Sequence, residues 1–174
     1  MATKKTAIFT LTERVTVDST NNTFASIDLG SYVDIGDRQA LQIHSVDFIY
    51  QATQPGGNVP GALGGDASIH VQVTDLNRGG LVFANDRALV ASGQIVYEQD
   101  GFMTNHTDLY PDNFGKGSDD GRYVVNDELY ITARTTTINA PEALNITVRV
   151  NASIVTLGAK DFMAIAIQST AADN

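Results

Sequence analysis

The sequence predicts an all-β protein, an antiparallel two-sheet β-sandwich or barrel of about eight strands. In residues 69–74 and 144–151, apolar and polar side chains alternate with a period of two. Successive side chains of a strand point to opposite faces, so this alternation buries one face and exposes the other. Turn-forming residues separate such runs at roughly 8- to 15-residue intervals, without the alternating helices of a parallel sheet. We therefore expect residues 1–174 to form a single domain.

The expected strands follow one another along the chain. They cover residues 8–17 (as one strand or two), 24–29, 41–50, 67–74, 94–99, 122–125, 128–134 and 144–157. β-Branched residues are frequent in the first run, as is typical of strands. The alternation changes phase near His44 and again near Asn151. A change of phase within a strand indicates a β-bulge, or a bend where the strand passes between sheets.

Two long loops are expected between the strands. Residues 52–66 are rich in glycine and proline, and we expect a flexible loop that does not belong to the core. Residues 100–121 form a second, acidic loop that contains one proline and several glycines. Loops of this length in compact domains are usually functional or mobile.

Two short helices are also expected. One lies near residues 86–92, with Asn85 or Asp86 as its N-cap and Gly93 as its end. The other covers residues 160–168, where a strand also fits the alternation. The capping residue Asp161 and the alanines that follow favour the helix.

Composition and charge exclude several classes of function. The chain has no cysteine, so disulfides, thiolate metal sites and thiol nucleophiles are absent. It has neither an apolar run of about 18 residues nor the apolar core of a secretory signal, so we expect synthesis in the cytoplasm of a cell. The net charge is −9, and residues 98–128 contain eight acidic and two basic residues. Such a region repels phosphate groups, which argues against direct nucleic-acid binding.

The sequence contains no catalytic motif. Its three histidines, His44, His70 and His106, form no His-x-His or His-x-x-x-His pair, and we expect structural or surface roles for the first two. No serine lies in a Gly-x-Ser-x-Gly motif, and no tryptophan is available as a sugar platform beside paired carboxylates. We therefore expect no enzymatic activity and no cofactor.

The acidic loop contains a candidate calcium site. Asp112, Asp119 and Asp120 lie on a glycine-rich backbone, and calcium prefers oxygen ligands of this kind. The spacing differs from that of an EF-hand, and Lys116 lies in the middle of the segment. A solvated acidic loop is therefore the favoured interpretation.

The outward faces of the expected strands carry Thr, Asn, Gln and Ser, and the whole chain has only four lysines. A monomer usually protects its strand edges and its surface with charge, lysine especially. Uncharged polar strands and long loops of small residues are better suited to contact with other subunits. The sequence therefore predicts self-association.

The sequence resembles the single jelly-roll capsid proteins of tailless icosahedral viruses. The similarity lies in the size, the number of strands, the short basic start Thr3-Lys4-Lys5, the lack of cysteine, and the loops at residues 52–66 and 100–121. It is one of architecture over the whole chain and rests on no diagnostic motif. The resemblance implies a jelly roll of two four-stranded sheets, with loops at one end that contact other subunits or face outward. The long basic arm that binds the genome in many such proteins is missing here, which puts genome contact in doubt.

Three functions follow from these observations. The first is a virion structural protein, a capsid subunit whose partners are copies of itself and other virion proteins, with residues 1–6 (Lys4 and Lys5 included) as an assembly arm. The second is a β-sandwich module that binds carbohydrate, calcium or both, with Tyr97, Tyr110 and Phe114 as stacking platforms. The third is a decoration or tail component of a phage. The sequence leaves membrane contact open.

Overall fold

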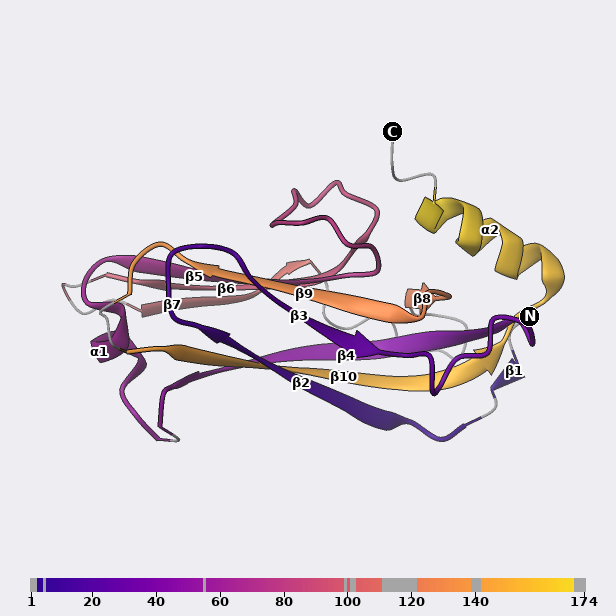
Figure 1. Ribbon diagram of the computed structural model, residues 1–174, viewed down its shortest axis with the longest axis horizontal. Coiled ribbons are helices and arrows are strands. Elements are labelled where there is room, and N and C mark those ends of the chain that lie inside the picture. The colour runs from indigo at the N-terminus through magenta and orange to yellow at the C-terminus, as the bar shows by residue number, and fades with distance from the viewer. Residues whose placement is uncertain are drawn as a thin grey trace.

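A computed structural model of the chain describes residues 3–4, 6–54, 56–98, 100, 103–110, 122–138 and 142–170. Within these residues, ten strands form two five-stranded antiparallel sheets (Figure 1). The strands are β1 (Thr3–Lys4), β2 (Phe9–Val17), β3 (Thr23–Asp28), β4 (Gln39–Ala52), β5 (Ala67–Thr74), β6 (Leu89–Tyr97), β7 (Met103–Tyr110), β8 (Arg122–Val124), β9 (Glu128–Thr135) and β10 (Leu144–Thr156). The helices are α1 (Val59–Leu63) and α2 (Ala159–Thr170). Only β1 and β8 are shorter than six residues, so the expected number of about eight substantial strands is confirmed.

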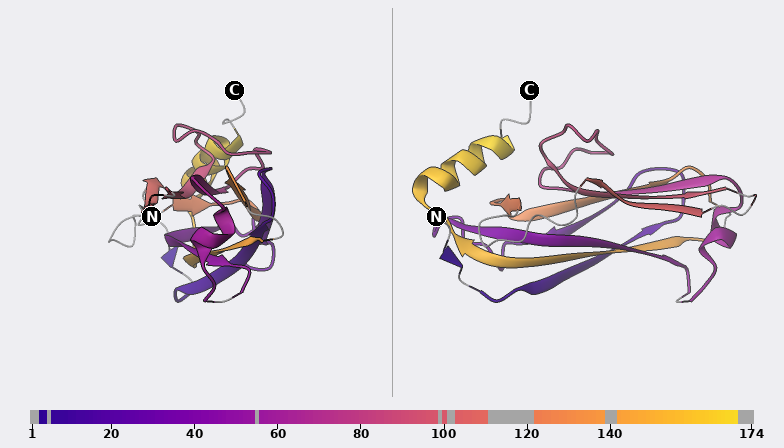
Figure 2. Two further views of the ribbon diagram at one scale, coloured as in Figure 1. Left: turned by 90° about the vertical axis from the view of Figure 1, so that its left-hand side faces the viewer. Right: turned by 180° about the vertical axis from the view of Figure 1, so that it is seen from behind.

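The strands pair in a nested order. Sheet A contains β1, β2, β10, β4 and β8, and sheet B contains β3, β9, β5, β6 and β7. Strand β2 pairs with β10, β3 with β9, β4 with β8, and β5 with β6. The first three of these pairs alternate between the sheets, so the chain forms one long antiparallel ribbon rolled around a core. This is the jelly-roll arrangement, and Figure 2 shows its two stacked layers from two further sides.

The core lies between the two sheets. Alternate residues of β10 are at most 1% exposed, and so are alternate residues of β5 in the opposite sheet: Leu144, Ile146, Val148 and Val150 of β10, and Ile69, Val71 and Val73 of β5. Burial of each such side chain contributes about 1.5–3 kcal/mol. The alternation that predicted these two strands therefore also identifies their core residues.

A β-bulge interrupts the pairing of β4 with β10. Asn151 pairs with Ser45 and the next residue, Ala152, pairs with Ile43, so His44 is the extra residue. The phase changes expected near His44 and Asn151 mark this one irregularity, seen from its two strands. Nε2 of His44 lies 2.9 Å from Oγ of Ser153, so the side chain of the bulge residue is hydrogen-bonded as expected.

The helix expected near residues 86–92 is wrong. Asp86 does act as a local cap, since its Oδ1 accepts a 2.8 Å hydrogen bond from the N–H of Ala88. The turn ends there, and Leu89 begins strand β6, which pairs with β5 on one side and β7 on the other. All residues from Leu89 to Gly93 are buried, and a short, fully buried run is as compatible with a central strand as with a helix.

Gly93 allows the two sheets to approach each other. It lies inside β6, and a Cβ atom at this position would be 2.7 Å from the hydroxyl oxygen of Tyr50 and 2.8 Å from Cδ2 of Phe48. Both aromatic residues belong to β4 in sheet A. Gly93, which the sequence predicts as the end of a helix, thus leaves room for two rings of the opposite sheet.

The expectation that residues 52–66 lie outside the core is wrong for α1. Pro60 fits the first turn of this helix, and Gly64 ends it in the left-handed conformation with φ of 72°. Ala62 and Leu63 are buried in the main core. The loop therefore contributes two apolar side chains that cover one end of the core.

The acidic loop is shorter than expected, because residues 103–110 form strand β7. This strand pairs antiparallel with β6 and lies at the edge of sheet B. An edge strand needs a backbone partner on one side only, so the polar composition of the segment does not prevent pairing.

Helix α2 confirms the helix expected at residues 160–168. Phe162, Ile165 and Ala166 have the i, i+3, i+4 spacing of one helix face, and they pack on a second apolar cluster made of Ala40, Val125, Val155 and Leu157. Ala40 precedes Leu41 of the main core, so β4 buries both of its faces at this end. Figure 1 shows α2 at the end of the sandwich where β10 finishes. Neither helix in the described ranges is long and apolar enough to cross a membrane.

Candidate interaction surfaces

The outer face of sheet A is formed by alternate residues of three neighbouring strands, and we call it the sheet A face. Its residues point away from the core and are half-buried or exposed. It consists of Thr10, Thr12, Arg14 and Thr16 of β2, Asn145, Thr147, Arg149 and Asn151 of β10, and Ser45, Asp47, Ile49 and Gln51 of β4.

Side-chain hydrogen bonds cross the strands on this face. Oγ1 of Thr10 donates to Oδ1 of Asn151 at 2.8 Å, and Nδ2 of Asn151 donates to Oγ of Ser45 at 2.9 Å. Further along the strands, Oγ1 of Thr16 donates to Oδ1 of Asn145 at 2.8 Å. Cross-strand pairs of this kind fix the rotamers of their members. The side chains of these pairs on the sheet A face are therefore held in fixed conformations.

The charge of the sheet A face differs from that of the rest of the chain. Eight of its twelve residues are uncharged hydroxyl or amide residues, and its charged residues are Arg14, Arg149 and Asp47. The face thus has a local charge of +1 in a chain of net charge −9, and it contains no lysine and no glutamate. Protein interfaces are enriched in arginine and depleted of lysine and glutamate. The sheet A face shares with such interfaces its two arginines and its lack of lysine and glutamate.

The longer edge strands of both sheets carry little of the usual protection against strand pairing. The edge strands are β1, β2 and β8 in sheet A, and β3 and β7 in sheet B. Lysine and proline commonly block edges, and among these strands only β1 contains a lysine, Lys4, while none contains proline. Glu13 of β2 is half-buried on the inward side and is the kind of inward charge that discourages pairing. Strands β3, β7 and β8 have uncharged residues at most positions.

Part of the predicted assembly arm, residues 1–6, pairs with strand β10 of the same chain. Thr3 and Lys4 form β1, which pairs with Thr156 and Val155 of β10. The hydroxyl of Thr6 accepts a 2.9 Å hydrogen bond from the N–H of Ile154. Lys5 lies outside the described residues. A role of this segment in assembly stays a prediction.

The candidate calcium residues Asp112, Asp119 and Asp120 also lie outside the described residues. Among the residues that are described, no group of three or more histidine and carboxylate side chains is arranged to hold a metal ion. A calcium site in the acidic loop therefore stays a prediction.

Tyr97 and Tyr110, two of the three aromatic residues predicted as stacking platforms, lie apart along the sheet. Tyr97 pairs with Met103 at the start of β7, whereas Tyr110 pairs with Ser92 at its other end. Five residue steps of about 3.3 Å along β6 separate Tyr97 from Ser92 by roughly 17 Å. Phe114 lies outside the described residues.

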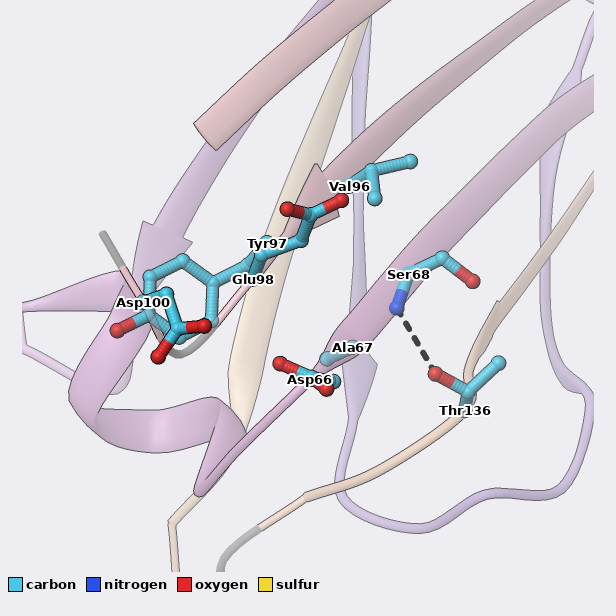
Figure 3. Close-up of a pocket in the computed structure, with 8 residues that line it drawn as sticks. All are labelled: Asp66, Ala67, Ser68, Val96, Tyr97, Glu98, Asp100 and Thr136. Atoms are coloured by element: carbon cyan, nitrogen blue, oxygen red, sulfur yellow. Dashed lines mark hydrogen bonds between the residues drawn. The ribbon is translucent and has the colours of Figure 1, made fainter. Parts of the chain in front are cut away.

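Tyr97 nevertheless lines a pocket of about 420 Å³ at the end of β5 and β6 (Figure 3). The pocket is also lined by three carboxylates and two hydroxyl side chains, Asp66, Glu98, Asp100, Ser68 and Thr136. The N–H of Ser68 donates to Oγ1 of Thr136 at 2.8 Å, which ties β5 to the segment that follows β9. Among the described residues that line this pocket, none is basic. Its chemistry suits a hydroxyl-rich or cationic ligand.

His70 is hydrogen-bonded within sheet B. Its Nε2 lies 3.0 Å from Oγ of Ser68, and it pairs with Arg134 across the strands. Burial, and secondly the charge of Arg134, lower the pKa of His70. The imidazole is therefore neutral at physiological pH, in agreement with the structural role expected for it.

The sequence predicts no binding role for residues 75–88, which connect β5 to β6 and cross the outer side of sheet B (Figure 1). This loop contains Phe83, which is 87% exposed. Asn77 and Gly79 of the same loop form one wall of a groove on sheet B. The only signal in the sequence is the apolar triplet Leu81-Val82-Phe83 between two turn-forming segments.

Comparison with protein-family models and with curated proteins found no match to the sequence. The geometry of these surfaces is therefore the basis on which a function is proposed.

Proposed function

We propose that this protein is a structural subunit of a virus particle, a shell protein without catalytic activity that assembles from many copies of itself. The observation that carries the proposal is the sheet A face, which is ordered, rich in hydroxyl and amide groups, and free of lysine and glutamate. Such a face can form hydrogen bonds with a second copy while few charges lose their water. Jelly rolls also occur in lectins, so the fold alone does not select this function.

The size of the sheet A face sets a limit on what it does alone. Three strands spaced about 4.8 Å apart and seven positions spaced about 3.4 Å apart give a footprint of roughly 350 Å². A stable protein interface buries about 800 Å² on each partner. Assembly through this face therefore requires additional contacts, from strand edges or from loops. Repetition of several such contacts in closed symmetry produces a shell.

Static light scattering and analytical ultracentrifugation of the purified chain test the proposal. The wild type is expected to form large assemblies, or defined oligomers such as pentamers or trimers. Placing acids on the sheet A face with Thr12→Glu and Thr147→Glu is expected to abolish the large species without loss of the β-type circular dichroism. Thr12→Glu and Thr147→Glu are made as separate variants. The matched control for each is Asn21→Glu, which adds the same single negative charge at an exposed turn. A wild type that stays monomeric at high concentration, or acidic variants that assemble like the wild type, would overturn the proposal.

The Tyr97 pocket supports the alternative, a module that binds carbohydrate, calcium or both. An aromatic ring beside carboxylates and hydroxyl groups is a chemically suitable lining for a sugar. The same preparation separates the two functions. A monomer whose melting temperature rises with calcium or with an oligosaccharide, and loses that rise on Tyr97→Ala, favours the module.

A further inference from the structure

Phe83 is the most exposed large apolar side chain in the part of the chain that the structure describes. It is 87% exposed, whereas the next most exposed side chain, Ile167, is 58% exposed. Burial of a phenylalanine side chain favours the folded state, and leaving the ring in water forgoes most of that gain. Single exposed apolar side chains are common at protein surfaces, so the meaning of Phe83 depends on how its backbone is held and on what lies beside it.

The backbone around Phe83 is fixed to sheet B. The N–H of Val82 donates to Oε1 of Gln72 at 2.7 Å, and Nε2 of Gln72 donates to the carbonyl oxygen of Val82 at 2.8 Å. One side-chain amide of β5 thus binds both backbone groups of Val82. On the other side, the carbonyl oxygen of Phe83 accepts a 3.0 Å hydrogen bond from the N–H of Asp86. Phe83 is therefore presented to solvent by an ordered backbone.

The base of the loop is closed as well. Nη2 of Arg78 and Oδ1 of Asp86 form an ion pair at 3.2 Å, and both side chains are largely shielded from solvent. The N–H of Asp75 donates to the carbonyl oxygen of Ala88 at 2.9 Å. Since the loop is already ordered, little further conformational entropy is lost when Phe83 becomes buried in a partner.

The same loop forms one wall of an apolar groove on the outer side of sheet B. The groove has a volume of about 460 Å³, and Phe24 and Tyr130 line it together with Asn77 and Gly79 of the loop. A cavity of about 150 Å³ is sufficient for a benzene ring. Phe24 is itself 55% exposed, and Gly79, with φ of +65°, adds no side chain to the wall. The groove therefore has room for an aromatic side chain and an apolar neighbour.

We propose that Phe83 of one copy inserts into the groove between Phe24 and Tyr130 of a second copy. This inference rests on the proposed function, because it names the contact through which copies associate on sheet B. Few polar groups line the groove, so it suits an uncharged ring better than a sugar. Offset or edge-to-face contacts with two aromatic rings add to the gain from burial, and buried aromatic anchors carry much of the energy of an interface.

The position of this contact complements the sheet A face. The loop and the groove lie on the outer side of sheet B, and Figures 1 and 2 show sheets A and B as opposite layers of the sandwich. One copy can therefore contact different neighbours through its two layers at the same time. A closed shell needs subunits with more than one such contact.

Single cysteines provide a direct test, because the chain has none of its own. Copies with Ala84→Cys, beside Phe83, are mixed with copies with Ser26→Cys, beside the groove, and oxidised mildly, so that both rings of the contact are kept. A disulfide-linked pair of the two different copies is expected, since insertion of Phe83 brings these exposed neighbours together. The matched control pairs Ala84→Cys with Ile35→Cys, at a residue that is 50% exposed on the loop before β4. Equal yields of the two cross-links would overturn the proposal.

Sedimentation of two further variants measures the energy of the contact. Phe83→Ser and Phe24→Asp are each expected to weaken association about 30-fold, the effect of losing a 2 kcal/mol anchor, whereas Ile35→Ser is not. The double variant is expected to be no weaker than the worse single variant, because both remove the same contact. An effect of Phe24→Asp without an effect of Phe83→Ser would show that another group fills the groove and would refute the inference. A wild type that never associates refutes the proposed function itself, whereas assembly that neither variant changes refutes only the inference.

Discussion

Replacement of Gly93 by alanine measures how closely the two sheets approach each other. The added Cβ would lie 2.7 Å from the Tyr50 hydroxyl oxygen and 2.8 Å from Cδ2 of Phe48. Non-bonded heavy atoms prefer separations of about 3.5–4.0 Å, so the two rings must shift or the sheets must separate. Overpacking of this kind costs about 1–3 kcal/mol. Alanine in an unobstructed strand would instead stabilise the protein by about 0.5–1 kcal/mol, so the two cases differ in sign.

Urea unfolding followed by circular dichroism gives the change in the free energy of unfolding. In a chain of this length, a loss of 1–3 kcal/mol lowers the melting temperature by roughly 2–12 °C. Tyr50→Phe in the Gly93→Ala background removes the nearest atom and is expected to recover part of the loss, but not the clash with Phe48. The control is Gly158→Ala, where the nearest atom to the new Cβ is Oδ2 of Asp161 at 3.4 Å. If Gly93→Ala is as stable as the wild type, the close approach of β6 and β4 is wrong.

Two further predictions concern the core and the join between the sheets. Leu63→Ala is expected to cost about 2–5 kcal/mol in urea unfolding, because Leu63 is buried in the main core, whereas a flexible loop would tolerate it without loss. Burial raises the pKa of Asp75, although Nη2 of Arg122 donates to its Oδ2 at 2.9 Å. The carboxyl group of Asp75 therefore stays protonated to a higher pH in the native state than in the unfolded chain, where its pKa is about 3.9. The contribution of Asp75 to stability therefore falls as the pH rises from about 3.9 to the raised value, and unfolding of Asp75→Asn measured across that range should lack this decline.

The alternation of side chains predicted most of the strands, because the burial that selects them has the same period as the strand itself. Residues 67–74 form β5, and the phase change at His44 is the bulge. Periodicity is uninformative where both faces are buried, so the sequence of Leu89–Gly93 fits a helix as well as the strand that it forms. The role of Gly93 depends on Phe48 and Tyr50, which lie more than forty residues away in the sequence. Such a contact has no local signature.

The interaction surfaces could be predicted only in part, for the same reason. The polar alternation of residues 144–151 indicated an outward face of amides and hydroxyls. The hydrogen bond between Thr10 and Asn151, which are 141 positions apart, requires the strand register. The exposure of Phe83 depends on the two hydrogen bonds between Gln72 and Val82, and the sequence gives no sign that these residues meet.

If the chain assembles as proposed, the number of its contact surfaces determines the kind of assembly that forms. If the sheet A face or the Phe83 contact were its only interface, and that interface were two-fold symmetric, association would stop at a dimer. With one contact on each layer, every copy joined through sheet B still presents its sheet A face to another neighbour. Loss of the Phe83 contact should then leave a small oligomer held by the sheet A face and the strand edges, and loss of both should leave monomers. A shell that instead depends on a single surface would fall directly to monomers when that surface is changed.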